Sequence, residues 1–162
     1  MTGIDLEIDS INTLLTAKLW LNNNNAFYGR VWENDHGQGV IPEIVSGDKY
    51  FEVLHNDRYD AQLFWRVMPT NKRGTGLYNV QLYVYVNLKK VYPTLENRDA
   101  YEEAIYDIIK VLRYANFRYE NTVTGREAFS YWKGSNQNKH DMNPYGMFRI
   151  DGIIHVYSMC LI

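Results

Sequence analysis

The sequence predicts an α+β protein with a mainly antiparallel sheet packed by two helices and long polar loops between elements. Three observations predict this class. The segment from Leu77 to Leu88 alternates strictly between aliphatic and polar or aromatic residues, which is the period of a β-strand. Two other segments carry apolar residues at helical spacing. The expected strands follow one another with short connections, which favours antiparallel pairing because parallel neighbours need long crossovers.

The first expected helix precedes all the strands. Asp9 or Ser10 can cap it, since short polar side chains accept hydrogen bonds from the free N–H groups of a first turn. Four asparagines, Asn22 to Asn25, end it because they favour turns. A short strand from Phe27 to Trp32 should follow. The apolar positions of the helix are Ile11, Leu14, Leu15 and Leu19.

The middle of the chain alternates between polar loops and strands. The segment from Glu33 to Gly47 is rich in Asn, Asp, Gly and His and reads as a loop long enough to have a role of its own. Strands are expected at Lys49 to Leu54 and at Ala61 to Met68. A basic, glycine-containing turn, Asn71 to Gly76, then leads into the alternating strand.

A second helix and further strands complete the prediction. Asp99 and Glu102 fit a D-x-x-E cap for an amphipathic helix running to Asn116. Gly152 in the last strand marks a bulge or a bend. No repeat or linker divides the chain, so we expect a single domain over residues 1–162. The expected elements after the helix are a strand at Arg126 to Lys133, a polar loop at Gly134 to Asn143 and a strand at Tyr145 to Leu161.

The two faces of the alternating strand differ in kind. One is entirely aliphatic and must pack on the core, whereas the other combines polar residues with Tyr83 and Tyr85. Exposed aromatic patches are unusual in monomers, so we expect these tyrosines to contact a neighbouring subunit. The alternative is a sheet covered by one helix on each face. The aliphatic positions are Val80, Leu82, Val84, Val86 and Leu88.

Composition excludes several classes of protein. The chain has 162 residues, 46% of them hydrophobic, which suits one domain with a substantial core. A net charge of −2 does not favour general attraction to nucleic acid. The 14 tyrosines favour interfaces, because tyrosine is amphipathic and loses little rotamer freedom. A single cysteine, Cys160, excludes an internal disulfide and fits a reducing compartment, and we expect neither a secretion signal nor a membrane span.

The residues that could carry chemistry do not form a recognisable catalytic or metal-binding motif. No histidine is spaced from another histidine or from Cys160 as metal ligands are. Asp57 and Asp60 fall between two strands, where aspartate usually forms turns. We therefore expect no enzymatic activity, no cofactor and no metal. An enzyme using Asp57, Asp60, His55 or His140 remains the alternative; the histidines are His36, His55, His140 and His155.

The order of elements and several short motifs resemble a known family. They are I-x-x-L-L in the first helix, G-R-V-W at Gly29 to Trp32, P-E-I-V at Pro42 to Val45, the strand from Val80 to Leu88, and D-A-Y-E-E-A-I-Y-D-I-I at Asp99 to Ile109. Together they are similar to the tail-terminator and tail-completion proteins of tailed bacteriophages. Two polar insertions, residues 33–39 and 134–143, go beyond the family pattern.

This resemblance implies a structural protein of the virion neck or tail. Such a protein assembles in the host cytoplasm into a homo-oligomeric ring, binds other neck, tail or portal-connector proteins, and meets DNA only as it passes through the lumen, without a membrane. A ring requires two different surfaces of the chain to meet head to tail. The alternative function is a small protein-binding adaptor or immunity-type module. The expected interface residues are Tyr83, Tyr85, Trp32, His36, Lys72 and Arg73.

Overall fold

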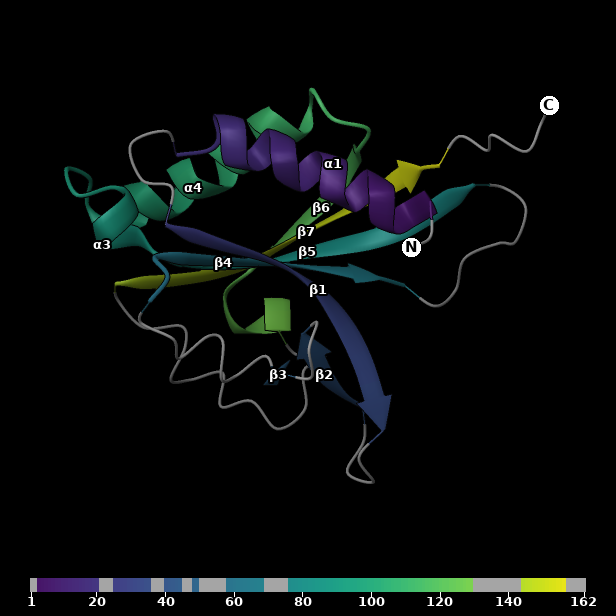
Figure 1. The fold of residues 1–162 in the computed structure, drawn as a ribbon. Coiled ribbons are helices and arrows are strands. Elements are labelled where there is room, and N and C mark those ends of the chain that lie inside the picture. The colour runs from purple at the N-terminus through teal and green to yellow at the C-terminus, as the bar shows by residue number, and fades with distance from the viewer. Residues whose placement is uncertain are drawn as a thin grey trace.

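The computed structural model describes residues 3–20, 25–35, 40–44, 48–49, 58–68, 76–129 and 144–156. It confirms the α+β class, with helices and a mostly antiparallel sheet (Figure 1). The elements are α1 (Gly3–Lys18), β1 (Ala26–Asp35), β2 (Val40–Ile44), β3 (Asp48–Lys49), β4 (Ala61–Val67), β5 (Leu77–Asn87), α3 (Leu88–Val91), α4 (Asn97–Leu112), β6 (Arg118–Thr124), the 3-10 helix η1 (Gly125–Phe129) and β7 (Tyr145–His155).

The strands form one sheet in the order β3-β2-β1-β4-β5-β7-β6. β5 lies at its centre and pairs along its full length with β7, from Leu77 opposite His155 to Asn87 opposite Tyr145. Among the described strands, β1 and β4 are the one parallel pair, and the other neighbours are antiparallel. The alternating segment is therefore the central strand of the sheet.

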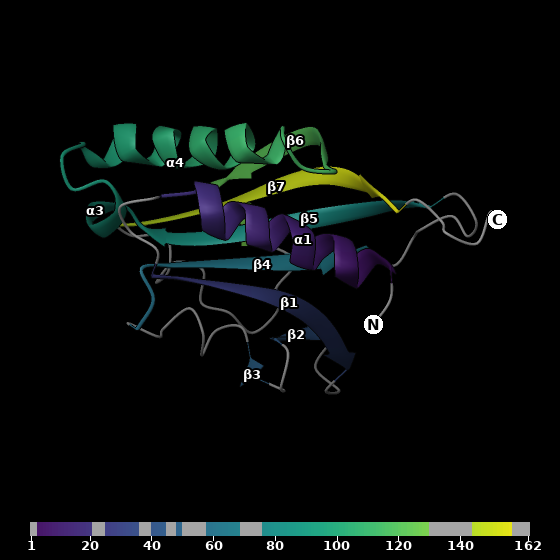
Figure 2. The same ribbon diagram turned by 45° about the horizontal axis from the view of Figure 1, so that its top comes forward.

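Both long helices lie on the same face of the sheet (Figures 1 and 2). The interpretation with one helix on each face is therefore wrong. The aliphatic side of β5 faces α1 and α4, as its alternation requires, and the buried Trp65 donates its indole N–H to Asn12 of α1 at 2.6 Å. The core on this face includes Ile8, Ile11 and Leu15 of α1, Leu82, Val84 and Val86 of β5, Ala104, Ile108 and Leu112 of α4, and Phe148 and Ile150 of β7.

The opposite face has a smaller core of its own. η1 lies beneath the sheet on this side (Figure 1), and Ala128 of η1 is fully buried there. The ring of Tyr145 stacks on that of Tyr85 at 5.0 Å. The buried members of this second cluster are Val31, Phe64, Tyr83, Tyr85, Ala128 and Met147.

The helix starts differ from those expected. α1 begins at Gly3 rather than after a cap at Asp9 or Ser10, because Ile4 and Ile8 extend its buried stripe towards the N-terminus. The expected cap was therefore wrong. Asp9 and Ser10 lie inside the helix, because the packing of its buried side chains stabilises the helix on both sides of them.

α4 begins two residues before the expected cap at Asp99. Its N-cap residue is Glu96, which makes no side-chain capping hydrogen bond. The short helix α3, which sequence reasoning did not predict, follows β5 directly; the Asn87 side chain caps it by accepting from the Lys90 N–H at 3.3 Å.

The region after α4 departs most from the prediction. The structure has a strand, β6, at residues 118–124, where none was expected, because its polar, mostly exposed residues show no alternation of hydrophobicity. The expected strand from Arg126 is a 3-10 helix as far as Phe129. Gly152 was expected to mark a bulge or a bend; the register shift between these strands lies opposite it in β6, between Tyr119 and Asn121. The remainders of the expected strands, residues 50–54, 130–133 and 157–161, lie outside the described residues.

Candidate functional site

The tyrosine-bearing face of β5 is buried inside the chain. Tyr83 is 0% exposed and Tyr85 is 5% exposed, both within the second core cluster. The expectation that they form an exposed surface for a neighbouring subunit was therefore wrong. Alternation correctly placed them on one face, but aromatic composition does not distinguish an interface from an interior layer.

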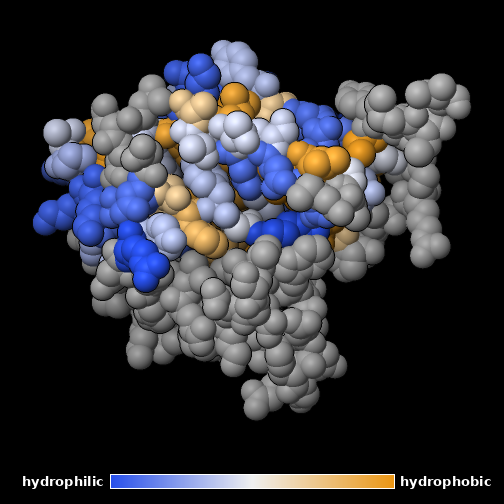
Figure 3. Space-filling view, viewed as in Figure 1, coloured by the Kyte–Doolittle hydropathy of each residue, from blue (hydrophilic) through white to orange (hydrophobic). Residues whose placement is uncertain are grey.

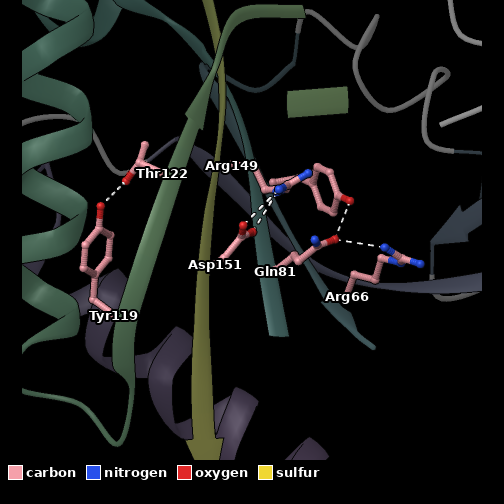
Figure 4. Close-up of polar contacts among 7 residues, drawn as sticks. Arg66, Gln81, Tyr119, Thr122, Arg149 and Asp151 are labelled. Carbon is pink, nitrogen blue, oxygen red and sulfur yellow. Dashed lines mark hydrogen bonds and ion pairs between the residues drawn. The ribbon is translucent and has the colours of Figure 1, made fainter. Parts of the chain in front are cut away.

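Polar side chains share this buried face through cross-strand hydrogen bonds. Gln81 of β5 accepts from Arg66 Nη1 at 2.9 Å and from the Tyr83 hydroxyl at 2.7 Å, both on its side-chain oxygen (Figure 4). Arg66 is only 4% exposed, so its charge depends on such partners. The three residues form a network that holds β4 against β5.

An ion pair continues this network on β7. Arg149 donates to both carboxylate oxygens of Asp151, at 2.7 Å and 2.9 Å (Figure 4). Burial lowers the pKa of Arg149, but the hydrogen bonds and charge of Asp151, with a contribution from Tyr83, raise the pKa above its ordinary value. The guanidinium therefore stays charged and serves as a structural anchor in this face.

Of the other expected interface residues, the structure describes only the backbone of Trp32. Trp32 lies in β1, where its backbone is opposite Glu43 of β2. His36, Lys72 and Arg73 lie outside the described residues, as do the candidate chemical residues His55, Asp57, His140 and Cys160.

Two of the candidate chemical residues are described and lie in separate places. Asp60 forms an ion pair of 3.6 Å with the exposed Lys90, at the turn that enters β4. His155 ends β7, and its carbonyl accepts from the Asn116 side chain at 2.5 Å. Within the described ranges, no group of three or more His, Cys, Asp or Glu side chains is placed to hold a metal ion.

A groove that the sequence did not predict opens between the C-terminal ends of α1 and α4. Its volume is about 630 Å³, within the range of small-molecule pockets. Leu14 and Leu19 come from α1 and the turn that ends it, and Val111 comes from α4. The remaining lining residues are Lys18, Trp20, Val91, Tyr92, Asp107, Lys110 and Tyr114.

A chain of hydrogen bonds joins three segments at the groove. The Trp20 indole N–H donates to the Tyr92 hydroxyl at 2.6 Å, and that hydroxyl donates to Asp107 Oδ2 at 2.5 Å. The Trp20 and Tyr92 rings meet edge to face at 6.5 Å. Burial, then the hydrogen bond to Asp107, raises the pKa of Tyr92 well above its ordinary value. The neutral hydroxyl thus links the end of α1, the residue after α3, and α4.

Trp20 has an unusual backbone conformation. Its φ is +50°, in the left-handed region that residues other than glycine rarely adopt. The strain costs roughly 1–2 kcal/mol, and the hydrogen bond and ring contact to Tyr92 offset it. Strained residues concentrate where a fold presents a functional surface, which makes this groove a candidate site.

Two lysines flank the apolar floor of the groove. Lys18 ends α1 and Lys110 lies in the last turn of α4, and both are exposed. Neither forms an ion pair with another residue in the described part of the chain. The groove therefore combines an apolar floor, the hydrogen-bonded side chains of Trp20, Tyr92 and Asp107, and two positively charged lysines at its rim.

Other large apolar side chains are exposed at separate places on the surface. Figure 3 shows hydrophobic areas interrupted by hydrophilic ones over the helical side of the molecule, one of them at the N-terminal end of α1. Tyr114, which also lines the groove, is 83% exposed. In the part of the chain that the structure describes, the other large hydrophobic residues that are exposed are Leu6, Leu77, Leu95, Tyr106 and Tyr119.

The residues of the groove carried only weak signals in the sequence. Asp107 and Lys110 fall off the apolar stripe of α4, which is typical of a solvated helix face. Trp20 follows the last apolar position of α1, and Tyr92 precedes Pro93 in a turn. Only tertiary structure brings these four positions together.

Comparisons of the chain with protein-family models, with curated proteins and with solved structures found no match. None of the helices in the described residues is long and apolar enough to cross a bilayer.

Proposed function

We propose that this protein is a non-enzymatic structural component of a tailed-bacteriophage neck or tail, and that it assembles into a homo-oligomeric ring around the DNA passage. The order of elements supports the proposal: a helix, a run of strands, a long central strand, a single long helix and closing strands. The ring would join portal-connector proteins on one side to tail proteins on the other.

The observation that carries the proposal is the distribution of exposed apolar surface along α1. A lysine-flanked groove lies at the C-terminal end of α1, and Leu6 is 59% exposed near the other end of the same helix. A ring needs two different patches on each chain, because each subunit contacts one neighbour with each patch. Patches at opposite ends of one helix meet that requirement.

The test is the state of association in solution and on particles. Light scattering after size-exclusion chromatography, with negative-stain imaging, should detect closed rings of one stoichiometry, either alone or after addition of tail tubes. DNA should not change the mass, because passage through a lumen requires no tight binding.

A protein that stays monomeric at high concentration and on tail tubes would contradict the proposal. A stable one-to-one complex with an unrelated protein would instead favour an adaptor or immunity-type module.

A further inference from the structure

The exposed surface of the first half of α1 is apolar and acidic. Leu6 and Asp9 lie three residues apart and therefore share one face of the helix, and both are exposed. We call this pair the α1 knob. The carboxylate of Asp9 forms no hydrogen bond or ion pair with another described residue.

The neighbouring acidic residues are already engaged within the chain. Asp5 pairs with Arg30 of β1 at 3.2 Å, and Glu7 accepts from Asn116 at 3.2 Å. The carboxylate of Asp9 is therefore the acidic group of this helix half that remains available for another molecule, beside the exposed Leu6.

The groove has the complementary character. Leu14 and Val111 contribute to an apolar floor, and Lys18 and Lys110 supply positive charge at the rim. A leucine with a carboxylate one turn later matches an apolar pocket beside two ammonium groups, because the apolar surface is removed from water while opposite charges meet at the edge.

The knob and the groove cannot meet within one chain. Leu6 and Lys18 are about 18 Å apart along the axis of a straight helix. Each copy can therefore offer its knob to one neighbour and accept the knob of another at the same time. Such a contact is heterologous, and its repetition closes a ring where the rotation allows.

We propose that the α1 knob of one copy docks in the α1–α4 groove of a second copy, with Asp9 between Lys18 and Lys110 of the partner. This inference rests on the proposed homo-oligomeric function and assigns its subunit interface. The Trp20–Tyr92–Asp107 hydrogen bonds would hold the groove in its receiving shape before the partner arrives.

Charge exchange tests the contact. Asp9→Lys, and separately the double variant Lys18→Glu/Lys110→Glu, should each weaken self-association by about tenfold or more, because attraction becomes repulsion. The triple variant D9K/K18E/K110E should recover association to within about threefold of the wild type. Glu102→Lys is the matched control, since it makes the same charge change at an exposed position of α4 away from the groove.

Zero-length crosslinking gives a second measurement that needs no substitution. A carbodiimide joins a carboxylate to a lysine only when the two are in contact. In a mixture of ¹⁴N- and ¹⁵N-labelled protein, mass spectrometry should find mixed-isotope links from Asp9 to Lys18 or Lys110.

The outcomes separate this interface from the ring itself. If the wild-type protein forms rings but D9K associates as tightly as E102K, the interface is wrong and the proposed function stands. If the wild-type protein forms no oligomer, alone or on tail tubes, both are wrong. Crosslinks from the groove lysines to a different protein only would assign the groove to that partner and overturn docking of a second copy.

Discussion

The face of the sheet beneath α1 and α4 is packed with aliphatic side chains, whereas the opposite face combines aromatic rings with polar groups. On the first face the buried indole N–H of Trp65 is satisfied by one side chain, Asn12. On the second, Arg66, Gln81 and Tyr83 satisfy one another across the strands. The first face is held by removal of apolar area from water, and the second depends on complete hydrogen bonding as well. A change in polarity should therefore affect the two faces differently.

The largest effect should follow from a charge on the aliphatic face. Val84 is fully buried at the centre of β5, among side chains that offer no partner for a carboxylate. Val84→Asp should abolish cooperative folding, because an unpaired buried charge costs several kcal/mol, a large share of a domain's stability. Loss of the near-ultraviolet circular dichroism signal is the measurement.

The control for this change is Val84→Ala, which leaves a cavity without a charge and should lower the free energy of unfolding by roughly 2 kcal/mol. A folded Val84→Asp protein of normal stability would show that the aliphatic face can supply a partner after all.

Removal of a ring from the second face should be the next largest effect. Tyr83→Ala should lower the free energy of unfolding by about 3–5 kcal/mol, since it empties a fully buried site and leaves Gln81 with one donor fewer. Urea denaturation measures it. Tyr106→Ala is the control: Tyr106 is 54% exposed, and the expected change is within about 0.5 kcal/mol.

This result also decides between the two interpretations of the tyrosines. If Tyr83→Ala left stability unchanged and impaired only assembly, the burial of Tyr83 would contribute nothing to the free energy of unfolding, and the assignment of its ring to the core would be wrong.

Period-two patterning predicted the central strand and the membership of each face correctly. It could not predict that the polar and aromatic face would be buried as well, because that burial depends on residues far away in the sequence, such as Ala128 of η1 and Met147 of β7. Tyrosine is favoured at interfaces because it is both apolar and polar, and the same property suits an interior layer in which Tyr83 finds Gln81.

The groove was unpredictable for a related reason. Trp20, Tyr92 and Asp107 come from three segments, and each has an ordinary local explanation. Helical periodicity identified the core sides of α1 and α4, but the space that remains between two helices depends on how they pack on the sheet. The strand β6 was missed because an exposed edge strand has no apolar alternation.

A third prediction concerns the close approach of chain segments on the helix-covered side. A Cβ on Gly152 would lie 2.2 Å from Phe117 Cζ and 2.6 Å from the Arg118 carbonyl oxygen. Gly152→Ala should therefore lower the free energy of unfolding by about 1–3 kcal/mol, because β6 or the Phe117 ring must move. Chemical denaturation measures this change.

Phe117→Ala provides the test of mechanism. It removes the ring contact but not the carbonyl contact, so the double variant should be less destabilised than the sum of the two single variants. Full additivity would mean that the strain of Gly152→Ala does not come from the Phe117 ring.

A smaller effect is expected where the hydrogen bonds are partly open to water. Tyr92→Phe removes the acceptor of the Trp20 N–H and the donor to Asp107, and should cost about 1 kcal/mol. The strained backbone of Trp20 should relax as well, which a change in tryptophan fluorescence would report. An unchanged spectrum together with unchanged stability would mean that the hydrogen-bond chain does not hold the groove.

The effect that is smallest at neutral pH involves Tyr28 on the helix-covered face, and it develops only at alkaline pH. Burial raises the pKa of Tyr28 in β1 to about 12, and the hydrogen bond with Thr16 of α1 lowers it only in part. The folded protein therefore holds the phenolic proton more tightly than the unfolded chain, whose tyrosines titrate near pH 10. The contribution to stability is complete below pH 10 and is lost as the pH rises from 10 to about 12.

Tyr28→Phe cannot ionise, so its free energy of unfolding should fall less steeply than that of the wild type over this interval, with similar values at pH 7–9. Parallel slopes for the two proteins in urea titrations at each pH would mean that Tyr28 is as accessible to hydroxide as a surface tyrosine, and that α1 does not seal this part of the aliphatic face.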